Sequence, residues 1–79
     1  MKVKVLFFGA TASITQTREM VFATGDDISA GELRETVVVE FPQLVSHKLF
    51  VAIDQRHAND ADVIPKGAEI AVFTAVSGG

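Results

Sequence analysis

The chain has 79 residues, of which 48% are hydrophobic and 22% charged, a composition typical of a globular domain and not of a disordered tail. A chain of this length forms one domain at most, over residues 1–79, with a modest core and little room for a deep enclosed active site. The formal net charge is −3 with scattered basic residues, which argues against a nucleic-acid partner, and the lack of cysteine excludes disulfides, thiolate metal ligands and a cysteine nucleophile.

The sequence MKVKVLFFGA predicts a first strand over residues 2–8. Its apolar run is too short for a transmembrane helix and weak as a signal peptide, so we expect a cytoplasmic protein with no membrane partner. Successive side chains of a strand alternate between its two faces, so Leu6 and Phe8 lie opposite the other apolar residues. Those residues are Val3, Val5 and Phe7.

The polar stretch GATASITQT predicts a connection between the first strand and a second one. We expect the second strand over residues 18–24, where Met20 and Phe22 alternate with Glu19 and Val21. The two strands then pair as a hairpin.

The segment GDDISAGELRETVVVEF predicts the main helix, beginning at about Ala30. Ser29 is a good N-cap, Glu32 three residues later completes a capping box, and Pro42 ends the helix. The three consecutive valines have weak helix propensity, but the cap and one apolar stripe favour the helix. The stripe consists of Ala30, Leu33, Val37 and Phe41.

The remaining segments predict two further strands. QLVSHK is a connection or a short helical turn, and residues 49–53 form a short apolar strand, as expected in the interior of a sheet. DQRHAND is turn-like, and residues 65–67 form a tight turn before the last strand over residues 69–75. One helix across a mixed sheet of four or five strands is an α+β fold. The β-grasp (ubiquitin-like) roll fits this order, as one of several topologies that the pattern allows.

No catalytic constellation is visible in the sequence. His47 and His57 flank the third predicted strand, too far apart for a dyad or a shared metal site, and are expected to be solvated loop residues. Asn59, Asp60 and Asp62 resemble part of a calcium loop but lack its glycine and its terminal glutamate, so turn formation explains them better. We therefore expect no metal, no tightly bound cofactor and no active site within the chain itself.

The final residues, AVFTAVSGG, close on two glycines. The simplest interpretation is a frayed terminus. In a second interpretation, residues without side chains extend into a narrow channel on a partner and present an unhindered carboxylate. An acyl-adenylate made with ATP turns that carboxylate into a good electrophile, which a sulfur or amine nucleophile then attacks. The tail that would enter the partner consists of Val76, Ser77, Gly78 and Gly79.

An apolar patch is expected on the face of the sheet that the helix does not cover. Leu6 and Phe8 point away from the helix-packed face, and Phe73 and Val76 lie beside them near the tail. On a small monomer such a patch is a contact surface for a partner, unless loops cover both faces.

Three segments carry a family resemblance: KVKVLFFGA, LFVAIDQ and KGAEIAVFTAVSGG. In order and over the whole chain they resemble the MoaD family, the small sulfur-carrier subunits of molybdopterin synthase. The resemblance implies a β-grasp protein whose Gly79 carboxylate is adenylated, with ATP, by an E1-like adenylyltransferase and converted to a thiocarboxylate. It also implies docking on the large synthase subunit in a heterotetramer, where that subunit supplies the active site and the sulfur passes to the pyranopterin precursor.

The chain departs from the family pattern at three places. Residues 11–13 are Thr-Ala-Ser where the family has Leu-Arg-Glu, Asp54 replaces an asparagine, and residues 74–75 replace paired prolines. Other interpretations therefore stay open. The chain could be a sulfur carrier for thiazole synthesis, thiolated-tRNA synthesis or amino-acid sulfuration, a ubiquitin-like modifier that forms an isopeptide through Gly79, or a plain interaction module.

Overall fold

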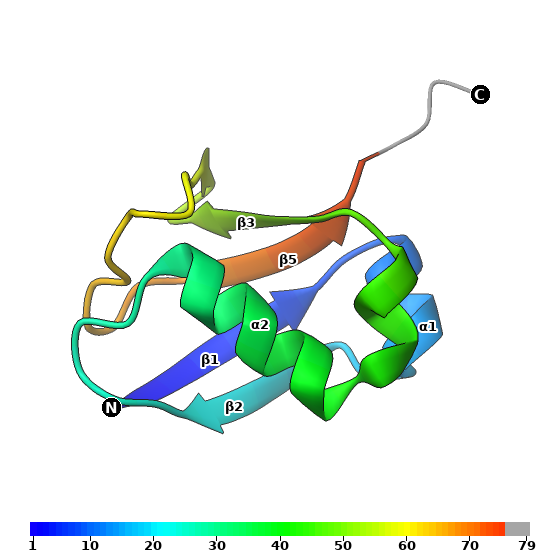
Figure 1. Ribbon diagram of the computed structural model, residues 1–79, viewed down its shortest axis with the longest axis horizontal. Helices are drawn as coiled ribbons and strands as arrows, with labels where there is room; N and C mark the ends of the chain where they lie inside the picture. The colour runs from blue at the N-terminus through cyan, green and yellow to red at the C-terminus, as the bar shows by residue number, and fades with distance from the viewer. Residues whose placement is uncertain (76–79) are drawn as a thin grey trace.

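The computed structural model describes residues 1–75, which form five strands and three helices. The strands are β1 Lys2–Phe7, β2 Glu19–Ala23, β3 Leu49–Ile53, β4 Arg56–His57 and β5 Ile70–Thr74, and the helices are α1 Ala10–Thr15, α2 Ala30–Glu40 and the 3-10 helix η1 Pro42–Ser46. The sheet order is β2-β1-β5-β3-β4, with β1 and β5 parallel and the other neighbours antiparallel. Helix α2 lies across one face of the sheet (Figure 1). The α+β, β-grasp prediction is confirmed.

The core lies between α2 and the sheet. β1 and β5 alternate between inward and outward side chains, and α2 directs its apolar stripe toward them. The four strands that the sequence predicts begin and end within one residue of their expected positions. The buried core residues are Val3, Val5, Phe7, Phe22, Ala30, Leu33, Val37, Leu44, Leu49, Val51, Ile64, Ile70 and Val72.

Helix α2 has the predicted capping box at its N-terminus. Glu32 N–H donates to the Ser29 hydroxyl oxygen at 3.1 Å, and Ser29 N–H donates to the Glu32 carboxylate at 3.0 Å. These hydrogen bonds lower the pKa of the Glu32 carboxyl below its ordinary value. At the other end, Phe41 N–H donates to Val37 O at 2.9 Å, and Pro42 then begins η1. The helix therefore begins and ends where the sequence predicts.

The segment that the sequence predicts to be a polar connection contains the short helix α1. That prediction is wrong because two of its threonines are buried: Thr11 and Thr15, one helical turn apart, are 0% and 8% exposed. Thr15 Oγ1 donates to Thr11 O at 2.8 Å, so its burial leaves no unpaired hydroxyl. The helix ends at Thr15, and the next residue, Gln16, caps it with a left-handed φ of 55°. β1 and β2 pair antiparallel as predicted, but a helix connects them.

The pairing of β3 also differs from the prediction. The sequence predicts a turn over DQRHAND with His57 in a loop, whereas a two-residue turn at Asp54 and Gln55 folds β4 back onto β3. These two residues have φ of 50° and 69°, as a type I′ hairpin turn requires. β4 pairs only with Ala52 and Ile53, so the first half of β3 is a sheet edge and not the sheet interior. Leu49 and Val51 of β3 are buried in the core, whereas Phe50 between them is only half-buried, on the opposite face.

The loop after β4 is held against the N-terminus of α2. Ala30 N–H donates to Asp62 O at 2.8 Å and Gly31 N–H to Asp60 O at 3.0 Å, which satisfies two N–H groups that a helix start leaves free. Arg34 donates two hydrogen bonds to the Asp60 carboxylate, at 2.6 and 2.8 Å. A Cβ on Gly31 would lie 3.1 Å from the Cβ of Asp60, so glycine permits this close approach.

Two valines of α2 test the assignment of its buried face. Val37 is 0% exposed and Val39 is 80% exposed. Val37→Ala removes buried methyl groups and leaves a cavity, so we expect it to lower the free energy of unfolding by about 2 kcal/mol. Val39→Ala should change it by less than about 0.5 kcal/mol, because the side chain is solvated and alanine favours a helix. Chemical denaturation of both variants measures this, and equal losses would contradict the orientation of α2.

The Arg34–Asp60 pair predicts a pH-dependent contribution to stability. Hydrogen bonds from Arg34 lower the pKa of the Asp60 carboxyl below its ordinary value. Such a carboxylate stabilises the fold above its unfolded pKa of about 3.9, and the contribution is lost as the pH falls through the folded value. Asp60→Asn should therefore be less stable than the wild type at neutral pH. The difference should begin to shrink only as the pH falls below about 4, and should vanish once the pH is below the lowered folded pKa. Denaturation of both proteins at several pH values measures this difference in stability. A difference that does not change with pH would contradict the prediction.

Candidate docking face and tail

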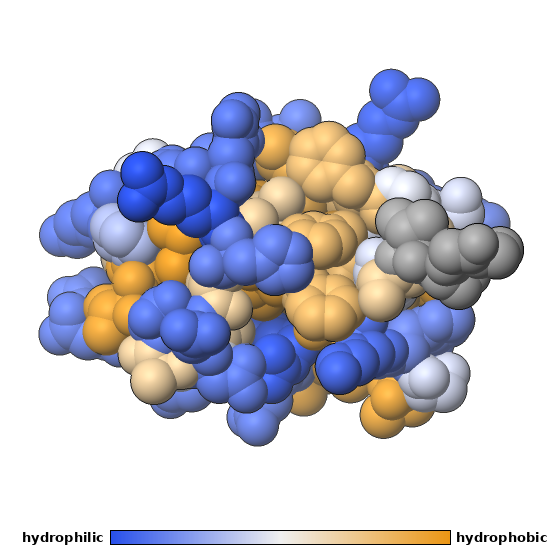
Figure 2. Space-filling model, turned by 90° about the horizontal axis from the view of Figure 1, so that it is seen from above, coloured by the Kyte–Doolittle hydropathy of each residue, from blue (hydrophilic) through white to orange (hydrophobic). Residues whose placement is uncertain are grey.

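The face of the sheet opposite α2 carries a cluster of three aromatic rings. Phe50 and Phe73 are cross-strand partners in the β3–β5 pair, and their rings stack with centroids 5.8 Å apart. The His57 ring contacts both edge-on, at 5.5 Å from Phe50 and 5.2 Å from Phe73. Figure 2 shows hydrophobic rings gathered in the middle of the surface, with hydrophilic side chains around them.

Leu6 and Phe8 extend this surface at the end of β1. Leu6 is half-buried and pairs with Ala71 of β5, whereas Phe8, the first residue after β1, is 52% exposed. Both side chains lie outside the core, as predicted. The surface formed by Leu6, Phe8, Phe50, His57 and Phe73 is called the aromatic face below.

A buried threonine of α1 ties the end of β1 to β5. Thr11 Oγ1 lies 2.6 Å from Phe8 O and 3.0 Å from Val72 O, so its single hydroxyl proton is shared between the two carbonyls. Phe8 N–H also donates to Val72 O, at 3.2 Å. These bonds hold the Phe8 end of β1 next to the last residues of β5. The Thr11 side chain is therefore occupied inside the fold and unavailable to a partner.

The last described residues lie beside the aromatic face. Phe73 is the second-last residue of β5, which ends at Thr74, and Ala75 is exposed. The residues predicted to enter a partner lie outside the described part of the chain: Val76, Ser77, Gly78 and Gly79. The chain thus passes from the aromatic face directly into the segment that the sequence singles out.

The chemistry of the aromatic face is that of a binding surface. Its apolar centre is bordered by charged side chains: Lys48 Nζ lies 5.7 Å from the Phe50 ring centroid, and Lys4 pairs with Glu19 at 3.0 Å. An apolar centre with a polar rim is the usual anatomy of a protein–protein interface. Over residues 1–75, no three histidine, aspartate or glutamate side chains gather closely enough to hold a metal ion. In the same residues, no helix has the length and hydropathy needed to cross a bilayer.

Sequence reasoning does not identify Phe50 and His57 as members of this surface, or Lys48 as part of its border. Strand alternation is a sufficient signal for Phe50, because its neighbours Leu49 and Val51 are both buried in the core. His57 is harder, because its position depends on the register of a two-residue hairpin turn. His47, by contrast, is exposed at the end of η1, as expected for a loop histidine.

Comparison with known proteins identifies the family. The ThiS family model matches residues 5–79. The chain belongs to the ThiS family. One curated relative, the molybdopterin synthase sulfur carrier subunit of Caenorhabditis elegans, is 31% identical over 83 residues, which cover 100% of this chain and 99% of that protein.

Two solved structures share the fold of this ThiS-family chain. SAMP1 from Haloferax volcanii matches 100% of both chains with a TM-score of 0.86 at 21% identity. A chain in the complex of subunits 1 and 2 of the molybdopterin-converting factor from Helicobacter pylori matches 100% of both chains with a TM-score of 0.67 at 23% identity. These likenesses agree with the β-grasp topology of the sheet.

Proposed function

We propose that this ThiS-family chain is the sulfur-carrier subunit of a molybdopterin synthase. The observation that supports this most strongly is the end-to-end match with relatives that bear that name. The aromatic face beside the start of the tail supports it independently, since a carrier must dock on the enzymes that load and unload its end.

Gly79 is the proposed reactive residue. A carboxylate oxygen of Gly79 attacks the α-phosphorus of ATP, pyrophosphate leaves, and a mixed anhydride with AMP forms. A sulfide-level nucleophile then forms a C–S bond at the carbonyl carbon, and AMP leaves with the electron pair of the broken C–O bond, so that a thiocarboxylate remains. An E1-like adenylyltransferase binds the ATP and supplies the catalytic groups, and the carrier itself binds no cofactor tightly. We also propose that the carrier acts in the cytoplasm, a compartment that supplies ATP.

The large synthase subunit is the proposed receiver of the sulfur. It would cover the aromatic face and take up the tail, with two carriers and two large subunits in a heterotetramer. Burial of Leu6, Phe8 and Phe73 supplies apolar area, and the glycines let the reactive end pass through a narrow channel. The pterin pocket and the groups that accept the sulfur belong to the large subunit.

A mass measurement tests the proposed loading of Gly79. Incubation with ATP, an E1-like adenylyltransferase and a sulfide source should raise the intact mass by about 16 Da, because sulfur replaces one carboxylate oxygen. A chain that lacks Gly79 is the matched control and should gain no mass. An unchanged mass of the full chain with its best-matched activating enzymes would overturn the proposal. The product formed with a large subunit then separates this pathway from other sulfur-transfer pathways.

Binding measurements test the proposed docking on the aromatic face. Phe73→Ala removes a ring from the centre of this surface and should weaken binding to the large subunit about 10- to 100-fold. Val39→Ala removes an exposed side chain from α2, on the other side of the molecule, and should change the affinity less than about twofold. Calorimetric titration measures both, after circular dichroism has shown that each variant is folded. Equal affinities for the two variants would place the docking surface elsewhere.

A further inference from the structure

The first half of β3 has a backbone edge that faces away from the sheet. Asp54 N–H donates to Glu69 O at 2.8 Å across the β3–β5 pair. In an antiparallel ladder every second residue bonds the same neighbour, so the backbone groups of Phe50 also face β5. Those of Leu49 and Val51 therefore face the opposite edge.

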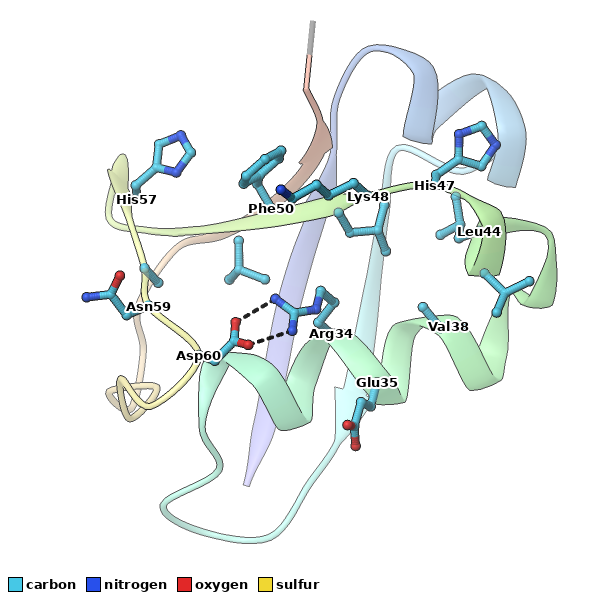
Figure 3. A pocket seen from close by; sticks show the side chains of 14 residues that line it. Arg34, Glu35, Val38, Leu44, His47, Lys48, Phe50, His57, Asn59 and Asp60 are labelled. Carbon is cyan, nitrogen blue, oxygen red and sulfur yellow. Dashed lines mark hydrogen bonds and ion pairs between the residues drawn. The ribbon is translucent and has the colours of Figure 1, made fainter.

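β4 covers the second half of that edge and leaves the first half free. Ala58 N–H donates to Val51 O at 2.9 Å, after which the chain turns away toward α2 (Figure 3). Among residues 1–75, no backbone group bonds Leu49 N–H, Leu49 C=O or Val51 N–H on this side. Three unpaired groups in a row are a template for another strand.

The free edge borders a groove of about 740 Å³ between β3 and α2. Val38 of α2 and Leu44 and Val45 of η1 give it an apolar lining, while Asp60 lies toward one end and His47 toward the other (Figure 3). A strand added in the plane of the sheet would pair with the first half of β3, at the edge that β4 covers over the second half. Every second side chain of that strand would point toward Val38. The groove thus offers both main-chain and side-chain contacts to an extended segment.

The charges around the groove favour a segment that carries a carboxylate. Arg34 is already paired with Asp60, at 2.6 Å, and Glu35 extends from α2 on the side away from β3 (Figure 3). Lys48 is different: within residues 1–75 its ammonium forms no ion pair and lies near the Phe50 ring. A carboxylate next to Lys48 would form a charge-assisted hydrogen bond with its ammonium group.

Two occupants from this chain itself fit the groove poorly. The tail, residues 76–79, is assigned by the proposed function to the partner and is therefore unavailable. A second copy would bring a second Lys48 close to the first and join two chains that each carry a net charge of −3. The occupant is then an extended segment of a different protein.

We propose that the protein which docks on the aromatic face also adds an extended segment to the free edge of β3, with a carboxylate-bearing side chain beside Lys48. This rests on the proposed function, which supplies the docking partner. Phe50, His57 and Lys48 each line the groove and also lie on or beside the aromatic face, so one partner reaches both without a gap. Main-chain pairing fixes the register of the partner against the sheet from which the tail emerges.

Amide hydrogen exchange of the full chain, free and bound to the large subunit, tests the proposal. Strand addition should slow exchange of the Leu49 and Val51 amides by at least about tenfold on binding. The Phe50 amide bonds β5 in both states and is the internal reference. Unchanged exchange at Leu49 and Val51 in a complex that forms, and that Phe73→Ala weakens, would overturn strand addition while leaving the proposed function intact. Failure of the complex to form would overturn both.

Charge reversal provides a second readout. Lys48→Glu should weaken binding to the large subunit about five- to tenfold, whereas Lys66→Glu, in the exposed turn before β5, should change it less than about twofold. Equal effects of the two variants would argue against a carboxylate beside Lys48. Slowed exchange at Leu49 and Val51 that depends on protein concentration without the large subunit would identify a second copy as the occupant and overturn the proposal.

Discussion

The parallel pairing of β1 with β5 at the centre of the sheet is the constraint on which the other features depend. It joins the first and last strands of the described chain, with Val5, Leu6 and Phe7 opposite Ile70, Ala71 and Val72. Because parallel strands end at the same edge, the end of β1 lies beside the end of β5, close to the last described residue. Thr11 holds this junction by hydrogen bonding to a carbonyl of each segment. The surface at the end of β1 therefore lies next to the end of β5, the strand that precedes the segment proposed to carry sulfur.

A single covering helix leaves the two faces of the sheet in different environments. α2 buries the inner face, and the capping box and the Arg34–Asp60 pair fix where that helix begins and which loop holds it. The outer face keeps an aromatic cluster in contact with solvent. Exposure of this apolar area is unfavourable, and a partner that covered it would remove that cost. The fold thus supplies the position of the reactive end and a surface for recognition, while the catalytic groups of the proposed reaction come from partners.

Local signals in the sequence predict most of the fold, and the differences arise where long-range contacts decide. Ser29 and Glu32 predict the start of α2 because a capping box is a local interaction. Helix α1 is not predicted because Thr11 and Thr15 are polar residues, which suggest an exposed connection. In the structure both are buried, through contacts with β5 and neighbouring turns. Phe73 and Leu6 follow from strand alternation, whereas His57 requires the hairpin register, and the free edge of β3 becomes visible only once β4 is known to be two residues long.

A structure of this chain bound to the large synthase subunit tests the central claim most directly. The account predicts that Phe50, Phe73 and Leu6 are buried against the partner, that the tail lies in its active site, and that Val39 on α2 remains in solvent. A complex in which the partner covers α2 and leaves the aromatic face exposed would contradict the account.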